Sequence, residues 1–307
     1  MTTYLVTGGC GFIGSHMVDR LLAAGNDVVA IDNLSTGKRK NLNVNAIFLE
    51  GSIADENFVT GVFKKHNISG VIHEASHINT SVQEEDPRRD LSVNVQGTIN
   101  LMEATVRHDA GKFVYASSVA VYGSPKIIPI DEDGPVQPIY SYGIAKQCAE
   151  EYVRYYGATR GLDFNIARYG NIFGPRQPVY GEVGVIAIFT QKVVHQEPLV
   201  VFGDGEHIRD FLYIDDAVEA TMQLFGNTNS DTYNIAMGKG CSVNDVVKYF
   251  KAAADYPLEI TFKHERPNEL GKFTADISKI KQTTGWVPSH DLASGILATL
   301  NYYYGPS

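Results

Sequence analysis

Residues 7–14 read Thr7-Gly8-Gly9-Cys10-Gly11-Phe12-Ile13-Gly14, with Gly8, Gly11 and Gly14 each three residues apart. The apolar run before them is typical of a buried strand, and the segment after them has apolar residues at helical spacing. Glycines here allow a tight turn, let a pyrophosphate approach the backbone, and let the helix pack closely on the strand. The helix N-terminus adds N–H groups and positive partial charge for an anion. We therefore expect a dinucleotide to bind at this turn.

Strand-like and helix-like segments alternate along the first half of the chain. They are expected at Tyr4–Thr7, Phe12–Ala24, Val28–Ile31, Val71–His73, Asp90–Arg107, Phe113–Ala116, Gly143–Thr159 and Asp163–Arg168. Such alternation is typical of a parallel sheet with helices on both faces. The predicted fold class is α/β, with a Rossmann-type doubly wound parallel sheet.

The pattern changes after Gly174-Pro175, where loops separate isolated helices expected at Val185–His195, Asp215–Phe225 and Val243–Ala253. We predict two domains: residues 1–170 form the NAD-binding Rossmann domain, and 171–307 a smaller α+β substrate-binding domain. Two further strands, Phe211–Ile214 and Tyr233–Ile235, are expected to return to the first body, so that about 211–236 packs back on the NAD domain.

Composition narrows the functional classes. The 307 residues carry a formal net charge of -9, which disfavours nucleic acid and anionic membranes as partners. The three cysteines are odd in number and far apart, which favours a reducing compartment. No apolar run approaches the ~18 residues that span a bilayer, and no basic leader opens the chain. We expect a cytoplasmic protein without a membrane partner.

Asp32 lies at the end of the second predicted strand, 18 residues after Gly14. A carboxylate at this position accepts hydrogen bonds from a ribose diol and repels a 2'-phosphate. The predicted cofactor is therefore NAD rather than NADP. We predict no metal: His73 and His77 are four apart, but His73 ends a predicted strand, where helical ligand geometry does not apply.

Tyr142 and Lys146 are four apart at the start of a predicted helix, so their side chains share one face. A nearby lysine and a cationic nicotinamide could lower the pKa of the phenol enough for it to act as a base. Ser117 and Ser118 end a predicted strand at the carboxyl edge, where parallel sheets bind ligands. Ser118 could hold a substrate hydroxyl against Tyr142.

These residues resemble a known family, the extended short-chain dehydrogenases/reductases, and more narrowly the UDP-glucose 4-epimerases and related sugar-nucleotide epimerases. The resemblance covers nearly the whole chain. It rests on the glycine motif, Asp32-Asn33-Leu34-Ser35, Asn94-Val95-Gln96-Gly97-Thr98, Ser117 to Gly123, Tyr142 with Lys146, Arg168 to Arg176, Gly203-Asp204-Gly205, and Arg209-Asp210-Phe211.

The resemblance implies a set of site residues. Tyr142 would be the base, Lys146 its tuning residue and Ser118 its hydroxyl partner. The expected NAD site consists of Gly8, Gly11, Phe12, Ile13, Gly14, Asp32, Asn33, Ser35, Thr36, Gly37, Ser52, Ile53, Ala75, Asn94, Ser117, Tyr142 and Lys146. The expected UDP-sugar site consists of Ser118, Tyr142, Asn171, Phe202, Arg209, Arg266 and Phe273.

The residues after Ser118 separate the reactions that relatives carry out on a 4-keto sugar. Related dehydratases have an Asp-Glu pair there and related decarboxylases a Glu, whereas this chain has Val119 and Ala120. Without a carboxylate for elimination, the keto sugar can only be reduced again, and reduction on its other face inverts C4. The predicted enzyme is an isomerase; the alternatives are a dehydratase or decarboxylase, a reductase with exchangeable cofactor, and a non-catalytic dinucleotide-binding protein.

Three departures from the family pattern bear on details. Gly170 replaces a common Phe near the hexose, and Ser52 replaces an Asp near the adenine amine. Phe273 occupies a position that walls the sugar pocket, where a bulky ring disfavours an acetamido group. We therefore expect UDP-glucose and UDP-galactose as substrates, with UDP-N-acetylhexosamines as the alternative.

The resemblance also implies a homodimer. Relatives pair through two helices that correspond to Asp90–Arg107 and Gly143–Thr159 here. The predicted contact residues are Leu91, Val95, Tyr152 and Tyr156.

Overall fold

The computed structural model describes residues 2–78, 86–178, 184–264 and 271–304. The chain forms two compact units. The first consists of residues 1–123, 136–168 and 218–233, and the second of 124–135, 169–217 and 234–307.

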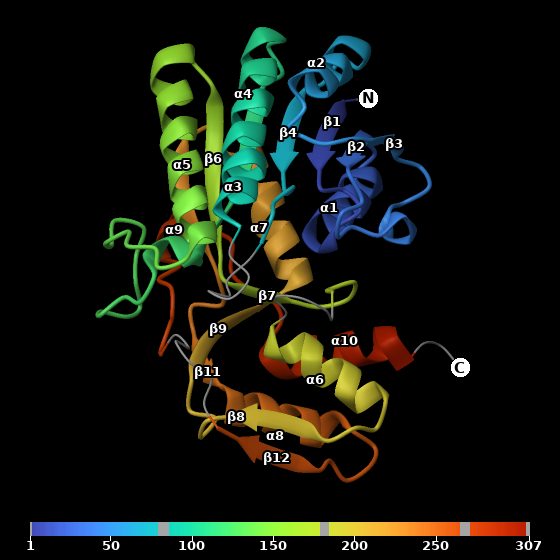
Figure 1. Cartoon of the computed structure of the whole chain (residues 1–307), viewed down its shortest axis with the longest axis vertical. Coiled ribbons are helices and arrows are strands. Elements are labelled where there is room, and N and C mark those ends of the chain that lie inside the picture. The colour runs from blue at the N-terminus through green and yellow to red at the C-terminus, as the bar shows by residue number, and fades with distance from the viewer. Residues whose placement is uncertain (1, 79–85, 179–183, 265–270, 305–307) are drawn as a thin grey trace. The chain divides into compact units, whose positions relative to one another are not determined.

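The first unit contains a seven-stranded sheet with the order β10-β6-β5-β4-β1-β2-β3. Figure 1 labels β6, β4, β1, β2 and β3 of this sheet. Its strands are β1 (Thr3–Thr7), β2 (Asp27–Asp32), β3 (Ile47–Glu50), β4 (Gly70–His73), β5 (Lys112–Ser118), β6 (Asp163–Tyr169) and β10 (Asp231–Ile235). The pairs β1-β2, β1-β4, β2-β3 and β4-β5 are parallel. The order of the first six strands is that of a doubly wound dinucleotide fold, whose ligand crevice lies at the carboxyl ends of β1 and β4, where the strand order reverses. The predicted fold class is confirmed.

Helices cover both faces of this sheet. On one face α2 (Glu56–Lys65), α4 (Gly97–Arg107) and α5 (Ser141–Arg160) enclose an apolar core that includes Leu5, Val71 and Phe113. On the other, α1 (Phe12–Ala23) packs against β1 and β2 through its buried Met17 and Leu21. Burial of these side chains at about 1.5 to 3 kcal/mol each is the main force that holds the layers together.

The helix predicted over Asp90–Arg107 is interrupted. A short α3 (Pro87–Asp90) leads into a π-helical stretch, Leu91–Gln96, before α4 begins. Periodicity alone could not predict this, because one wide turn barely changes the spacing of apolar residues. Such wide turns often occur at functional sites, and this one carries the buried polar side chain of Asn94, four residues after the buried Asp90.

The second unit has two small sheets. One joins β7 (Asn171–Phe173), β9 (Ile208–Tyr213) and β11 (Gly240–Ser242), and the other pairs β8 (Leu199–Phe202) with β12 (Ile260–Lys263). Its helices are α6 (Val185–Val194), α8 (Val243–Ala253), α9 (Ser278–Thr284) and α10 (Leu292–Tyr304); α7 (Ile214–Gly226) begins in this unit and continues in the first. Buried Asp210 accepts backbone hydrogen bonds from Met237, Gly238 and Ala275, which ties three segments together.

Among the described residues, no helix has both the length and the apolar character needed to cross a membrane.

Of the four predicted dimer contacts, Leu91 and Tyr152 are exposed, whereas Val95 and Tyr156 are buried within the first unit. The Tyr156 hydroxyl donates to Glu103 on α4, which explains why it does not face outward.

Candidate active site

The glycines of the turn lie where a Cβ atom would clash with the neighbouring backbone. A Cβ on Gly14 would lie 2.2 Å from the carbonyl oxygen of Gly8, and one on Gly8, at φ +67°, would lie 2.8 Å from the amide nitrogen of Ala75. The turn closes through a hydrogen bond from the Gly11 amide to the Gly8 carbonyl. Helix α1 then begins without a side-chain cap or an acidic residue in its first turn. Because no side chain among the described residues caps α1, its first N–H groups can donate to an anion, and the turn fits a pyrophosphate.

Asp32 shapes the other side of this cradle. Its carboxylate, nearly buried at the end of β2, accepts hydrogen bonds from the amides of Cys10 (3.0 Å) and Leu34 (2.8 Å). A Cβ on Gly37 would lie 2.8 Å from both carboxylate oxygens, so the loop packs directly on them. Each oxygen has a second lone pair that can accept a ribose hydroxyl. The Arg39 guanidinium lies over the Phe48 ring, 4.6 Å from its centroid.

Most other predicted NAD residues lie in the loops that follow the strands. Phe12 and Ile13 open α1, Thr36 lies in the loop after β2, and Ile53 is buried before α2. Local hydrogen bonds hold two of these loops, because Asn33 accepts from the Ser35 amide and Ser52 accepts from the Ala54 amide. The Ser52 hydroxyl thus shapes its own turn, and its role at the adenine remains a prediction.

Asn94 fixes the segment that follows β4. Its side-chain oxygen accepts from the His77 amide (2.8 Å) and from the Ser76 hydroxyl (3.1 Å), and its nitrogen donates to the His77 carbonyl (2.8 Å). His77 is also bonded to the buried carboxylate of Asp90, at 2.7 Å. Both ring nitrogens of His73 are hydrogen-bonded, to Thr7 and Thr98. Among the described residues, no group of three or more His, Cys, Asp or Glu side chains could hold a metal ion.

The structure brings Ser118, Tyr142 and Lys146 together in the first unit. Ser118 and also Ser76, which the sequence analysis did not single out, lie close enough to the Tyr142 hydroxyl to lower its pKa. Lys146 Nζ donates to the Ala116 carbonyl at 2.6 Å and lies 5.8 Å from the centroid of the Tyr142 ring. Ser118 also accepts from the Ala120 amide, so its hydroxyl proton remains available for Tyr142 or a substrate.

The electrostatics of this group differ from the expectation. Burial raises the pKa of Tyr142 to about 12, although its hydrogen bonds to Ser118 and Ser76 act in the opposite direction. Burial lowers the pKa of Lys146 to about 8, against the opposing effect of nearby Glu74 and Glu150. In the chain alone, burial therefore outweighs the lowering of the phenol pKa that the sequence led us to expect from Lys146. The positive charge of a bound nicotinamide ring would lower the pKa of the phenol further.

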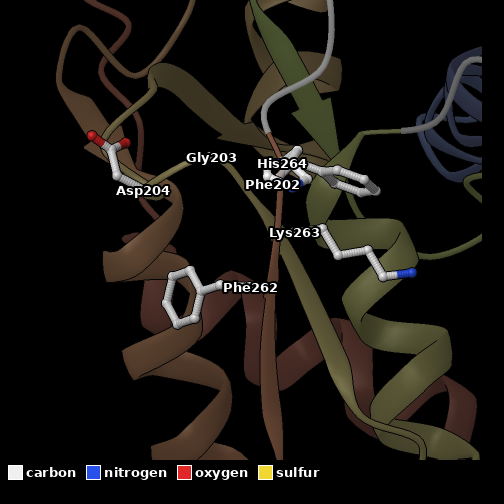
Figure 2. A pocket seen from close by; sticks show the side chains of 6 residues that line it. All are labelled: Phe202, Gly203, Asp204, Phe262, Lys263 and His264. Atoms are coloured by element: carbon white, nitrogen blue, oxygen red, sulfur yellow. The ribbon is translucent and has the colours of Figure 1, made fainter.

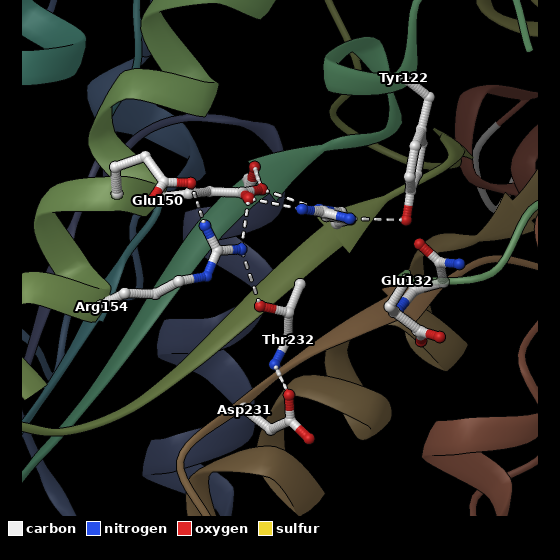
Figure 3. A network of polar contacts seen from close by, with 10 residues as sticks. Tyr122, Glu132, Glu150, Arg154, Asp231 and Thr232 are labelled. Carbon is white, nitrogen blue, oxygen red and sulfur yellow. Dashed lines mark hydrogen bonds and ion pairs between the residues drawn. The ribbon is translucent and has the colours of Figure 1, made fainter. Parts of the chain in front are cut away.

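A buried ion-pair network supports the ends of β5 and β6 (Figure 3). Arg168 donates to both carboxylate oxygens of Glu150, at 2.9 and 2.7 Å, and to the Tyr122 hydroxyl at 2.9 Å. Ser117 donates to the same carboxylate at 2.6 Å, and Arg154 donates to it at 2.8 Å. Because the Ser117 hydroxyl proton is used in this way, the hydroxyl could only accept a hydrogen bond from the cofactor.

The predicted substrate residues of the second unit occupy separate elements. Asn171 begins β7, Phe202 ends β8, and Phe273 is buried beside β9, where its amide donates to the Ile208 carbonyl. Arg209 donates from Nη1 to the carbonyls of Ile208 and Gly271. Arg266 lies outside the described residues.

Phe202 borders an open hollow of about 830 Å³ on the second unit. The other lining residues are Gly203, Asp204, Phe262, Lys263 and His264, and the rings of Phe202 and Phe262 point to opposite sides (Figure 2).

The surroundings of Gly170 are filled. A Cβ on Gly170 would lie 3.2 Å from the Ala236 Cβ. Gly170 therefore does not leave empty space in the direction of a side chain, because Ala236 fills it.

Sequence reasoning missed Ser76, Glu150 and Arg168 as parts of the site. Their roles depend on contacts between residues 18 to 66 positions apart, such as Glu150 with Arg168. Of these three residues, only Glu150 could have been predicted from the sequence. It follows Lys146 by four residues on a predicted helix and therefore lies on the same face.

A doubly wound sheet with a glycine turn, an acidic residue at the end of β2 and a Ser-Tyr-Lys group at the end of β5 defines a dinucleotide-dependent enzyme. A family model described as the NAD dependent epimerase/dehydratase family matches residues 4–236. The chain belongs to this family. The predicted family and the predicted NAD cofactor are confirmed.

Relatives and solved structures agree with this assignment. A putative UDP-glucose 4-epimerase of Methanocaldococcus jannaschii is 39% identical over 299 residues, 97% of each chain. The crystal structure of a Thermotoga maritima UDP-glucose 4-epimerase with UDP-glucose superposes with a TM-score of 0.95 at 38% identity and covers 98% of each chain. A Thermus thermophilus UDP-glucose 4-epimerase in complex with NAD has a TM-score of 0.92 at 35% identity and covers 100% of each chain.

Proposed function

We propose that this enzyme inverts the configuration at C4 of a UDP-hexose, UDP-glucose or UDP-galactose, through a transient 4-keto sugar. One observation favours epimerisation over the other reactions of the family. Ser118, Tyr142 and Lys146 are gathered at the end of β5, and the turn that follows Ser118 begins with the apolar Val119 and Ala120. Neither residue supplies a carboxylate for elimination, which favours epimerisation over a lyase reaction.

The glycine turn and Asp32 would hold NAD, which supplies a reversible hydride acceptor when bound. Tyr142 Oη would take the proton of the sugar 4-hydroxyl, and Ser118 would orient that hydroxyl. Lys146 would stabilise the phenolate by its charge. Inversion requires the keto sugar to present its other face, so the nucleotide must stay bound while the sugar turns. Asn171, Arg209 and Arg266 would hold the diphosphate, since arginine matches phosphate oxygens in bidentate geometry.

The direct test is conversion of UDP-galactose by the purified protein, followed by NMR of the products. We expect UDP-glucose and no accumulated 4-keto sugar; a dehydrated or decarboxylated product would instead establish the lyase alternative. Tyr142→Phe should lower kcat by about 10² to 10⁴-fold, while NAD stays bound. Tyr152→Phe is the matched control, because Tyr152 is an exposed tyrosine of the same helix, and it should leave kcat unchanged.

We further propose that the enzyme is a homodimer. The exposed apolar side chains Leu91, Ile144, Tyr152 and Tyr155 lie on neighbouring elements of the first unit, α5 and the π-helical stretch. A continuous exposed apolar surface is typical of a protein interface. Light scattering should show a dimer that Leu91→Lys weakens; a monomeric wild-type protein would contradict the proposal.

A further inference from the structure

We infer that His73 is a positioning residue of the active site: a neutral imidazole, protonated on Nε2 alone, that sets the Glu74–His77 segment between the glycine turn and Tyr142. The inference rests on the proposed function only for its activity measurement.

The tautomer follows from counting protons. The Thr98 hydroxyl donates its single proton to the Asn94 carbonyl at 2.7 Å, so at its 2.9 Å contact with His73 Nε2 it can only accept. Nε2 therefore carries a proton. On the other side of the ring, the Thr7 hydroxyl accepts from the Ala75 amide at 3.0 Å and lies 2.7 Å from His73 Nδ1. If Nδ1 carries no proton, it can accept the hydrogen bond that the Thr7 hydroxyl donates.

A doubly protonated ring does not fit this arrangement. Nδ1–H and the Ala75 N–H would then both donate to Thr7, and the Thr7 proton would need another acceptor where the side chain has no exposed surface. The ring is enclosed by Phe113 and Tyr115, at centroid distances of 5.9 and 5.6 Å. Burial, and then the charge of Lys146, hold the pKa of His73 well below its ordinary value, in agreement with a neutral ring.

The hydrogen bonds form a circuit through both halves of the site. Thr7 directly precedes the glycine turn and holds the Ala75 amide, against which Gly8 packs. The Asn94 carbonyl receives the Thr98 hydroxyl, while the Asn94 side chain binds Ser76 and His77. Ser76 in turn lies beside the hydroxyl of Tyr142, whose pKa it lowers. His73 is the group that connects the two ends of this circuit.

NMR of ¹⁵N-histidine protein tests the tautomer independently of catalysis. The His73 signals, assigned by their loss in His73→Phe and by their displacement in Thr7→Ser, should show a bare Nδ1 and a protonated Nε2 throughout about pH 5 to 8. Titration of the ring within that range, or a proton on Nδ1, would overturn the inference.

Paired variants test the positioning role. Thr98 and Thr105 are both buried on α4, and each donates at 2.7 Å to the carbonyl four residues earlier, but only Thr98 also accepts from His73. Thr98→Val should lower kcat by about tenfold or more, with a smaller change in KM, and should speed the loss of bound NAD. Thr105→Val should change neither, although both variants lose thermal stability.

A second pair gives the rescue. Thr7→Val removes the hydroxyl and should reproduce the loss of kcat and of NAD retention, whereas Thr7→Ser keeps the hydroxyl and should restore both. If Thr7→Val and Thr7→Ser had the same kcat and retained NAD equally, His73 would have a structural role only, and the inference would be wrong. If the protein proved not to be an epimerase, the tautomer and the NAD retention would still decide the inference.

Discussion

The ammonium group of Lys146 donates a 2.6 Å hydrogen bond to the carbonyl oxygen of Ala116, inside the first unit and away from solvent. This contact joins α5 to β5 through a residue that lies one helical turn after Tyr142. It also places a charged group where burial opposes its charge, so the protonation of Lys146 becomes sensitive to pH near neutrality.

Lys146 should lose its proton near pH 8 in the protein without NAD, because burial lowers its pKa to about 8. The unfolded chain keeps that proton up to about pH 10.4, so it binds more protons than the folded chain between these values. The free energy of unfolding should therefore rise between about pH 8 and pH 10, by at most about 3 kcal/mol. Urea unfolding of wild type and Lys146→Met across this range measures the difference; parallel curves would contradict the prediction.

Gly14→Ala should greatly weaken NAD binding and destabilise the fold by about 1 to 3 kcal/mol, because the new Cβ would lie 2.2 Å from the Gly8 carbonyl. Gly61→Ala is the matched control, since Gly61 lies inside α2 with nothing within 4 Å of its Cβ position. It should stabilise the protein by about 0.5 to 1 kcal/mol and leave NAD binding intact. Fluorescence titration with NAD and thermal unfolding give both quantities.

Glu150→Gln should destabilise the protein by about 3 to 5 kcal/mol, because it leaves the buried Arg168 guanidinium without its counter-charge. Glu151→Gln should cost no more than about 1 kcal/mol, since the Glu151 side chain is 67% exposed and also pairs with Arg154. Chemical unfolding of the two variants compares a buried with an exposed member of the same network; equal losses would show that burial does not matter here.

The same network should make the protein sensitive to acid. Burial would raise the pKa of Glu150, but the hydrogen bonds and charge of Arg168 outweigh it and hold the pKa below the ordinary value. A depressed carboxyl pKa contributes stability that is present above about pH 4.3 and is lost as the pH falls further. The free energy of unfolding of wild type should drop in this range more steeply than that of Glu150→Gln.

Sugar preference should follow Phe273. We expect higher kcat/KM for UDP-galactose than for UDP-N-acetylgalactosamine, because a bulky ring leaves little room for an acetamido group. Phe273→Ala should shift the ratio toward the acetylated sugar, whereas Phe262→Ala, which truncates an exposed ring, should not. A wild-type preference for the acetylated substrate would reverse this assignment.

The local parts of the fold were predictable from sequence because their signals are local. The glycine turn, Asp32 at the end of β2 and the pairing of Tyr142 with Lys146 all depend on residues close together in the chain. The position of Ser76 was not predictable, because its contact with Tyr142 arises only when β4 and α5 are brought together. Likewise, Val95 has the apolar character of an interface residue, and only the tertiary structure shows that it is buried within its own unit.

The alternation of the chain between its two units limits how the enzyme can be altered. Each unit is assembled from three separate segments, and β10, an edge strand of the large sheet, comes from residues beyond position 230. No single cut releases either unit whole. A new substrate preference therefore cannot be acquired by exchanging one contiguous module for another, and changes of single side chains are the simpler route to diversification.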